Sequence, residues 1–255
     1  MKSLPSINLF YWILIICANT LGETFGDLIS QTLDLGYGAS TVILLLLFFA
    51  MLGTSILAKN QVMLIYWLLI SISSTVGTTL SDYLARVISV NYLGLSEGIG
   101  YLIATLSLAF TLISVFTCWQ LFSKKIDLQK EFNKRTEFLY WIAIFISSSL
   151  GTAVGDLLAH DTPLGFQGGS IMLIALLLIV ILLLYTTKIS LETLYWLGII
   201  ITHPLGATLG DLITKPDGLN LGNLKASLIV FITLIVVIII GRKNLTKNVP
   251  KTASD

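Results

Sequence analysis

Four aspartates recur at one position of a repeated motif, inside segments that are otherwise apolar enough to lie in a membrane. Each copy opens on a Tyr-Trp pair, with a glycine ten residues after the tryptophan and an aspartate fifteen residues after it. The aspartates are Asp27, Asp82, Asp156 and Asp211. Glu23 adds a fifth carboxylate, in a column that the other copies fill with Thr78, Thr152 and Ala207. Because an ionised carboxylate in an apolar setting is costly, we expect a cation or a proton beside these groups.

The residue types around the aspartates favour hard cations. Carboxylate and hydroxyl oxygens are the ligands that Mg²⁺, Mn²⁺ and Ca²⁺ prefer. We expect the metal ligands to be Glu23, Asp27, Asp82, Asp156 and Asp211. Stepping back along the same helical stripe gives a polar pathway of Asn19, Thr20, Thr75, Thr78, Ser149, Thr152 and His203. The stripe carries no Cys or Met, which argues against copper, and a single histidine without thiolates makes zinc less suitable.

A structural interpretation of the same residues remains open. Each aspartate could cap a loop amide or bond across helices, and a duplicated structural device would recur as faithfully as a functional one. Glu23 occurs in only one copy, so repetition of a structural device does not account for it. His203 is read as a packing histidine or as a proton relay on the stripe of Asp211.

The composition places these residues in a polytopic membrane protein. Of 255 residues, 55% are hydrophobic and only 11% are charged. Apolar runs long enough to cross a bilayer as helices lie near 9–29, 41–58, 62–84, 99–122, 138–158, 170–187, 193–213 and 225–241. The runs are too long and too uniformly apolar for barrel strands, so we expect an all-α bundle of eight transmembrane helices. The basic residues form no stripe, and no nucleic-acid partner is expected.

The repeats predict how the helices are organised. The motif tryptophans are separated by 55, 74 and 55 residues, which indicates two duplicated halves, 1–122 and 138–255, joined by a basic linker at 123–137. Each half holds two hairpins, with motif helices at 9–29 and 62–84 and at 138–158 and 193–213. Four parallel two-helix repeats would then surround a polar axis. Small residues for close helix packing are Gly22, Gly26, Gly77, Gly151, Gly155, Gly206 and Gly210.

Basic residues and aromatic pairs predict the orientation. Most lysines and arginines lie between the repeats or near the chain ends, so both termini should face the cytoplasm. The Tyr-Trp pairs are read as anchors at the cytoplasmic membrane surface. Fifteen residues of helix rise about 22 Å, which places the aspartates in the outer part of the hydrocarbon core.

The frames LGETFGD and THPLGATLGDLITKP resemble a bacterial family known as uncharacterised membrane-anchored proteins, built from a repeat of unknown function. The resemblance covers nearly the whole chain, apart from the linker and the tail. It implies a bacterial plasma-membrane location and carries no activity with it. The family version of the fourth copy reads Thr-Arg-Pro where this chain has Thr202-His203-Pro204.

We therefore expect a transporter, or less readily a channel, for a small hard divalent cation, with membrane lipid and the cation as its partners. Proton coupling and homo-oligomerisation are left open, and no cofactor is expected beyond a bound divalent cation. One alternative is a proton-coupled transporter of a small organic solute, and another is a non-transporting membrane scaffold. An intramembrane aspartyl protease is disfavoured because no copy has the first glycine of GxGD.

Overall fold

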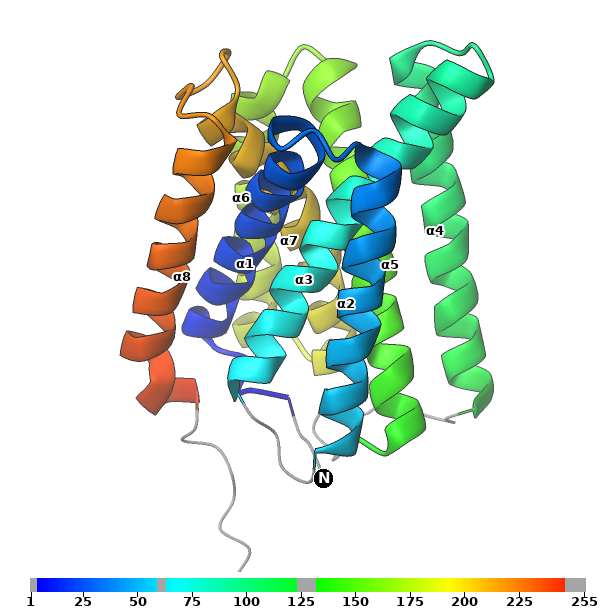
Figure 1. The fold of residues 1–255 in the computed structure, drawn as a ribbon. Helices are drawn as coiled ribbons and strands as arrows, with labels where there is room; N and C mark the ends of the chain where they lie inside the picture. The colour runs from blue at the N-terminus through cyan, green and yellow to red at the C-terminus, as the bar shows by residue number, and fades with distance from the viewer. Residues whose placement is uncertain (1–3, 59–62, 123–131, 246–255) are drawn as a thin grey trace, which may run out of the picture.

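A computed structural model describes residues 4–58, 63–122 and 132–245, with side chains described as far as residue 241. These residues form eight long helices, joined at two points by π-helical segments (Figure 1). The elements are α1 (Leu9–Asp27), η1 (Leu28–Thr32), α2 (Tyr37–Leu57), α3 (Met63–Asp82), η2 (Tyr83–Tyr92), α4 (Glu97–Phe122), α5 (Lys134–His160), α6 (Gly165–Thr186), α7 (Leu191–Thr214) and α8 (Asn223–Leu245). All eight are long and apolar enough to cross a membrane, which confirms the expected fold class.

The four motif helices form the inner layer of the bundle. Helices α1, α3, α5 and α7 each pack against the next, and α7 packs against α1, so the four close into a ring. Within their spanning windows 67% of the residues are buried, compared with 28–33% for the other four helices. The polar stripe and the small residues of the motif explain this placement, because neither is stable against lipid.

The outer helices each cover a motif helix of the following repeat. Helix α2 packs on α3, α4 on α5, α6 on α7, and α8 returns to pack on α1. Because α4 belongs to residues 1–122 and α5 to residues 138–255, the two halves of the chain are interleaved. The outer helices present apolar side chains such as Leu46 and Phe110 outward, where the surrounding medium must be lipid.

Close approach of the inner helices follows from the motif glycines. Each packs against the residue that precedes the glycine of the next motif helix by three positions, and a Cβ at any of the four would overlap that neighbour. The pairs are Gly22 with Ser74, Gly77 with Ser148, Gly151 with His203, and Gly206 with Asn19. The same contact therefore repeats around the ring, as expected for small residues at membrane helix interfaces.

Three boundaries of the motif helices differ from the expected ones. The first two motif helices continue beyond their aspartates as the π-helical segments η1 and η2. Helix α5 begins at Lys134, inside the expected linker, because the Asn133 side chain accepts a hydrogen bond from the Thr136 amide and caps the helix. Residues 123–131 of that linker lie outside the described residues.

Candidate functional site

The inner end of the axis, where the motif helices begin, is closed by a ring of tyrosines. Four hydroxyl groups contact one another in a cycle, with oxygen–oxygen distances of 2.7–2.9 Å. The ring consists of Tyr11, Tyr66, Tyr140 and Tyr195, in the order of their helices. Four hydroxyl protons suffice for four bonds, so each hydroxyl donates one and accepts one. No side chain is left between the four hydroxyls.

The prediction that the Tyr-Trp pairs anchor the protein at the membrane surface is therefore wrong. The tyrosines are 0–3% exposed and the tryptophans 1–8% exposed. Each tryptophan packs on the tyrosine of the preceding repeat, with ring centroids 5.4–6.4 Å apart. A buried ring is more stable than four surface anchors because it satisfies every hydroxyl while burying eight aromatic side chains.

One turn further along the axis lies an aliphatic layer. It consists of Ile15, Ile70, Ile144 and Ile199, all fully buried. These isoleucines follow the tyrosines by four positions and so share their helix face. The half of the axis in which the motif helices begin is therefore filled by buried aromatic and aliphatic side chains.

Glu23 occupies the centre of the outer half. Its Oε2 accepts hydrogen bonds from Thr78 on α3, at 2.9 Å, and from Thr152 on α5, at 3.1 Å. Helix α5 lies opposite α1 in the ring, so this carboxylate spans the axis. The fourth member of the column, Ala207, has no polar group. Thus three of the four repeats converge on one carboxylate, as the polar pathway predicted for Thr78 and Thr152.

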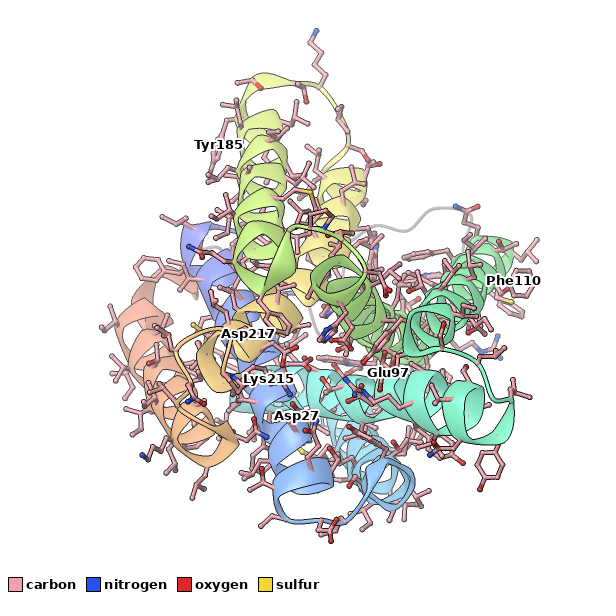
Figure 2. The ribbon with its side chains drawn as sticks, turned by 90° about the horizontal axis from the view of Figure 1, so that it is seen from above. Asp27, Glu97, Phe110, Tyr185, Lys215 and Asp217 are labelled. Carbon is pink, nitrogen blue, oxygen red and sulfur yellow. The ribbon has the colours of Figure 1, made fainter. Side chains whose placement is uncertain are left out.

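Three of the four aspartates have a partner four residues further along the chain. Gln31 donates to Asp27 Oδ1. Arg86 Nε lies 3.2 Å from Asp82 Oδ1, and its Nη1 lies 3.7 Å from exposed Glu97. Lys215 Nζ lies 3.4 Å from Asp211 Oδ1 and 2.5 Å from Asp27 Oδ2, which links α7 to α1. Figure 2 shows Lys215 and Asp27 side by side near the centre of the loop end.

Asp156 differs from the other three. It is 4% exposed, and within the described part of the chain it has no hydrogen-bonding or ion-pair partner. It interacts electrostatically with Asp82, Asp211 and Glu23, so it belongs to the same cluster. The sequence therefore predicted correctly that all five carboxylates are buried around one axis, but not that their partners would differ.

Lys215 is held in its charged form by this cluster. Partial burial lowers its pKa, but the carboxylates of Asp211 and Asp27 outweigh burial and raise it above the ordinary lysine value. The ammonium therefore acts as a tethered cation among the acidic groups. Glu23, Asp27 and Asp211 offer ligand oxygens within 4.8 Å of one another, a spacing compatible with a metal ion, although Lys215 already pairs with Asp27 and Asp211.

The sequence missed these partners although they occupy a regular column. Position four after each motif aspartate carries Gln31, Arg86, His160 and Lys215. All four side chains can donate a hydrogen bond, and residues four apart share a helix face.

The remaining residues of the expected polar pathway differ in the contacts that they make. Asn19 and His203 are buried, and the Asn19 amide and the His203 Nε2 have no hydrogen-bond partner among the described residues. His203 Nδ1 contacts Ser147 Oγ at 3.0 Å. Thr20, one position after Asn19, is also buried.

Thr75 and Ser149 make no side-chain contact with the central glutamate, unlike Thr78 and Thr152. Their hydroxyls bond to backbone carbonyls of their own helices. Thr75 instead lines a mostly apolar cavity of about 420 Å³ between α1, α2, α3 and α8.

Comparison with known proteins places the chain in a repeat family. No curated protein and no solved structure matches it. The family described as Repeat of Unknown Function (DUF347) matches at residues 10–61, 65–125, 139–190 and 194–242. These matches coincide with the four two-helix repeats and cover most of the chain. The protein therefore belongs to the DUF347 family, with four copies of its repeat.

Proposed function

We propose that the protein transports a small hard divalent cation, of the Mn²⁺ or Mg²⁺ kind, along the axis between the motif helices. The observation that carries this proposal is an imbalance of buried charge. Five buried carboxylates converge at the loop end of the axis, whereas the described residues place only Arg86 and Lys215 in ion pairs with them. The effective penalty for an unpaired buried charge is several kcal/mol, so additional cations or protons must accompany the remaining carboxylates.

The width of the axis supports a small ion over an organic solute. At the level of Glu23 the space between the helices is taken up by that side chain and two threonines. A pocket for an organic solute would be larger and mostly apolar. The carboxylates lie toward one end of the axis and the tyrosine ring closes the other end, which is compatible with access to the axis from one side at a time.

Protons are the natural competitors of the cation at these carboxylates. Cation binding to a buried carboxylate displaces its proton, so binding should weaken as the pH falls. Transport coupled to a proton gradient follows from the same groups and needs no additional residue.

We propose that the protein lies in the bacterial plasma membrane with both termini in the cytoplasm. The distribution of lysine and arginine supports this orientation. A membrane-impermeant thiol reagent tests it with Lys188→Cys, placed in a background without the two natural cysteines. Labelling from the cytoplasmic side alone is expected, and labelling from the outside would reverse the orientation.

The transport proposal is tested by Mn²⁺ uptake into proteoliposomes, with Mg²⁺ and Ca²⁺ as competitors. Uptake should exceed that of empty liposomes, and Glu23→Gln should reduce it at least tenfold because the central ligand loses its charge. Asp217→Asn is the matched control, since this carboxylate is exposed and lies beyond Lys215 (Figure 2). Uptake no greater than that of empty liposomes for Mn²⁺, Mg²⁺ and Ca²⁺, each measured alone, would refute the proposal.

A further inference from the structure

In one of the four repeats, the donor side chain four positions after the motif aspartate does not contact a motif aspartate. In the first, second and fourth repeats the donor contacts its aspartate or the neighbouring one. In the third repeat the corresponding residue is His160, which follows Asp156 by four positions. Within the described residues no bond joins the two side chains.

His160 is engaged in an aromatic stack instead. Its ring lies parallel to that of Tyr101 on α4, with an interplanar angle of 9° and centroids 6.2 Å apart. Its edge packs on Phe166 at 5.3 Å. On the same Tyr101 ring lies the Arg86 guanidinium, 5.5 Å from the centroid. The imidazole is therefore held by stacking interactions rather than by the carboxylate.

Tyr101 brings a second unpartnered oxygen to this place. The residue is fully buried, and its hydroxyl has no hydrogen-bond partner in the described chain. Of the charged groups around it, Asp156 acts most strongly on its hydroxyl. Asp156 lies one turn before His160 on α5, so it shares the helix face that packs toward Tyr101 on α4. Buried polar groups are usually satisfied, so the unpartnered Tyr101 hydroxyl beside a carboxylate without an ion-pair partner among the described residues is a position where a ligand could bind.

We propose that the Asp156 carboxylate and the Tyr101 hydroxyl form the exchangeable cation position of the acidic cluster. This assignment rests on the proposed cation transport and specifies where in the cluster the ion is held. Small hard divalent ions are commonly held by one or two carboxylates and keep several waters, so one carboxylate with a hydroxyl is a sufficient anchor. Glu23, which interacts electrostatically with Asp156, belongs to the same acidic cluster.

The remaining carboxylates have a different role in this arrangement. Asp27 and Asp211 hold the Lys215 ammonium, and Asp82 holds the Arg86 guanidinium. A divalent ion at these aspartates would have to displace a cation that is tethered to the chain. At Asp156 an ion displaces only water or a proton. The four motif aspartates look equivalent in the sequence. Because only Asp156 lacks a partner side chain in the described part of the chain, it is the one at which we expect the ion to bind.

The test measures Mn²⁺ binding to the full-length purified protein by calorimetry and by the thermal shift that Mn²⁺ produces. Asp156→Asn should lower the affinity at least tenfold and remove the shift. Without Mn²⁺ it should melt no lower than the wild type, because it removes an unpaired charge. Tyr101→Phe retains the stacked ring and should lower the affinity several-fold. Asp27→Asn should change it less than threefold.

Three results would overturn the assignment. Wild-type affinity in Asp156→Asn together with lost binding in Asp27→Asn would place the ion at Lys215, and cation transport would stand without this site. Unchanged affinity in Tyr101→Phe would remove the hydroxyl from the site, even if the Asp156 variant failed to fold. Absence of Mn²⁺ binding in the wild type would refute both this assignment and the proposed function.

Discussion

The tyrosine ring predicts an unusual pattern of stability in single and double variants. Tyr140→Phe removes one hydroxyl and with it two of the four bonds, those to Tyr66 at 2.9 Å and to Tyr195 at 2.7 Å. A net 0.5–1.5 kcal/mol for each bond gives a loss of about 1–3 kcal/mol. Interhelical bonds in membranes average about 0.6 kcal/mol, which favours the lower part of that range.

Double variants separate a closed ring from four independent tyrosines. Replacing the neighbours Tyr140 and Tyr195 breaks three bonds, because they share one. Replacing the opposite residues Tyr11 and Tyr140 breaks all four. The adjacent pair should therefore destabilise less than the sum of its single variants, by about the value of one bond. The opposite pair should be additive.

The assay is equilibrium unfolding in detergent, followed by near-ultraviolet circular dichroism of the aromatic rings. Tyr185→Phe on α6 is the matched control, since this tyrosine is 78% exposed and points away from the bundle (Figure 2). It should leave the free energy of unfolding unchanged. Equal stability of Tyr140→Phe and the control, or equal losses in the adjacent and opposite double variants, would refute the ring.

Three further changes follow from the packing and the charges. Gly206→Ala should destabilise the protein by about 1–3 kcal/mol in a thermal melt, because the new Cβ overlaps the neighbouring helix, whereas Gly53→Ala, with open space, should not destabilise it. Thr152→Val should lower the free energy of unfolding by about 1.5–3 kcal/mol, because it removes a hydrogen-bond donor from Glu23. Thr233→Val on the exposed face of α8 should be nearly neutral. Equal losses of stability in the two variants would contradict the hydrogen bond to Glu23. Lys215→Met should increase Mn²⁺ affinity, because the two bridged aspartates lose their tethered cation, and a decreased affinity in calorimetry would contradict this. The pKa of Lys215 is higher in the folded protein than in the unfolded chain, where it is about 10.4. The charged ammonium therefore stabilises the fold fully below about pH 10.4, and this stabilisation is lost only as the pH rises through the folded pKa.

Repetition is the reason that so much of the fold could be predicted. Eight apolar runs fix the helices, and four copies in one register fix which helices face the axis. The motif glycines predicted close packing, and each of Gly22, Gly77, Gly151 and Gly206 makes the same contact. Register and periodicity are local properties of a sequence, and they were sufficient for this level of structure.

The aromatic pairs show where local reasoning fails. Tyr and Trp at the start of an apolar run are typical of a membrane interface, and nothing within one repeat contradicts that interpretation. The ring exists only because four tyrosines meet across a closed cycle of helices. The packing of α8 on α1, which closes the outer layer, depends in the same way on the whole assembly.

The partners of the aspartates could have been found from the sequence. Arg86 and Lys215 follow their aspartates by the four positions that place residues on one helix face. What no spacing could predict is that His160 turns to Tyr101 and leaves Asp156 without a partner, because that choice depends on the packing of α4 against α5.

The most direct test of a cation site is a structure determined with Mn²⁺, with anomalous scattering used to locate the ion. We expect one peak among the buried carboxylates, about 2.0–2.2 Å from an oxygen of Asp156, with Lys215 still paired to Asp27. No peak within the cluster at saturating Mn²⁺, with every carboxylate remaining as it is described here, would contradict the account.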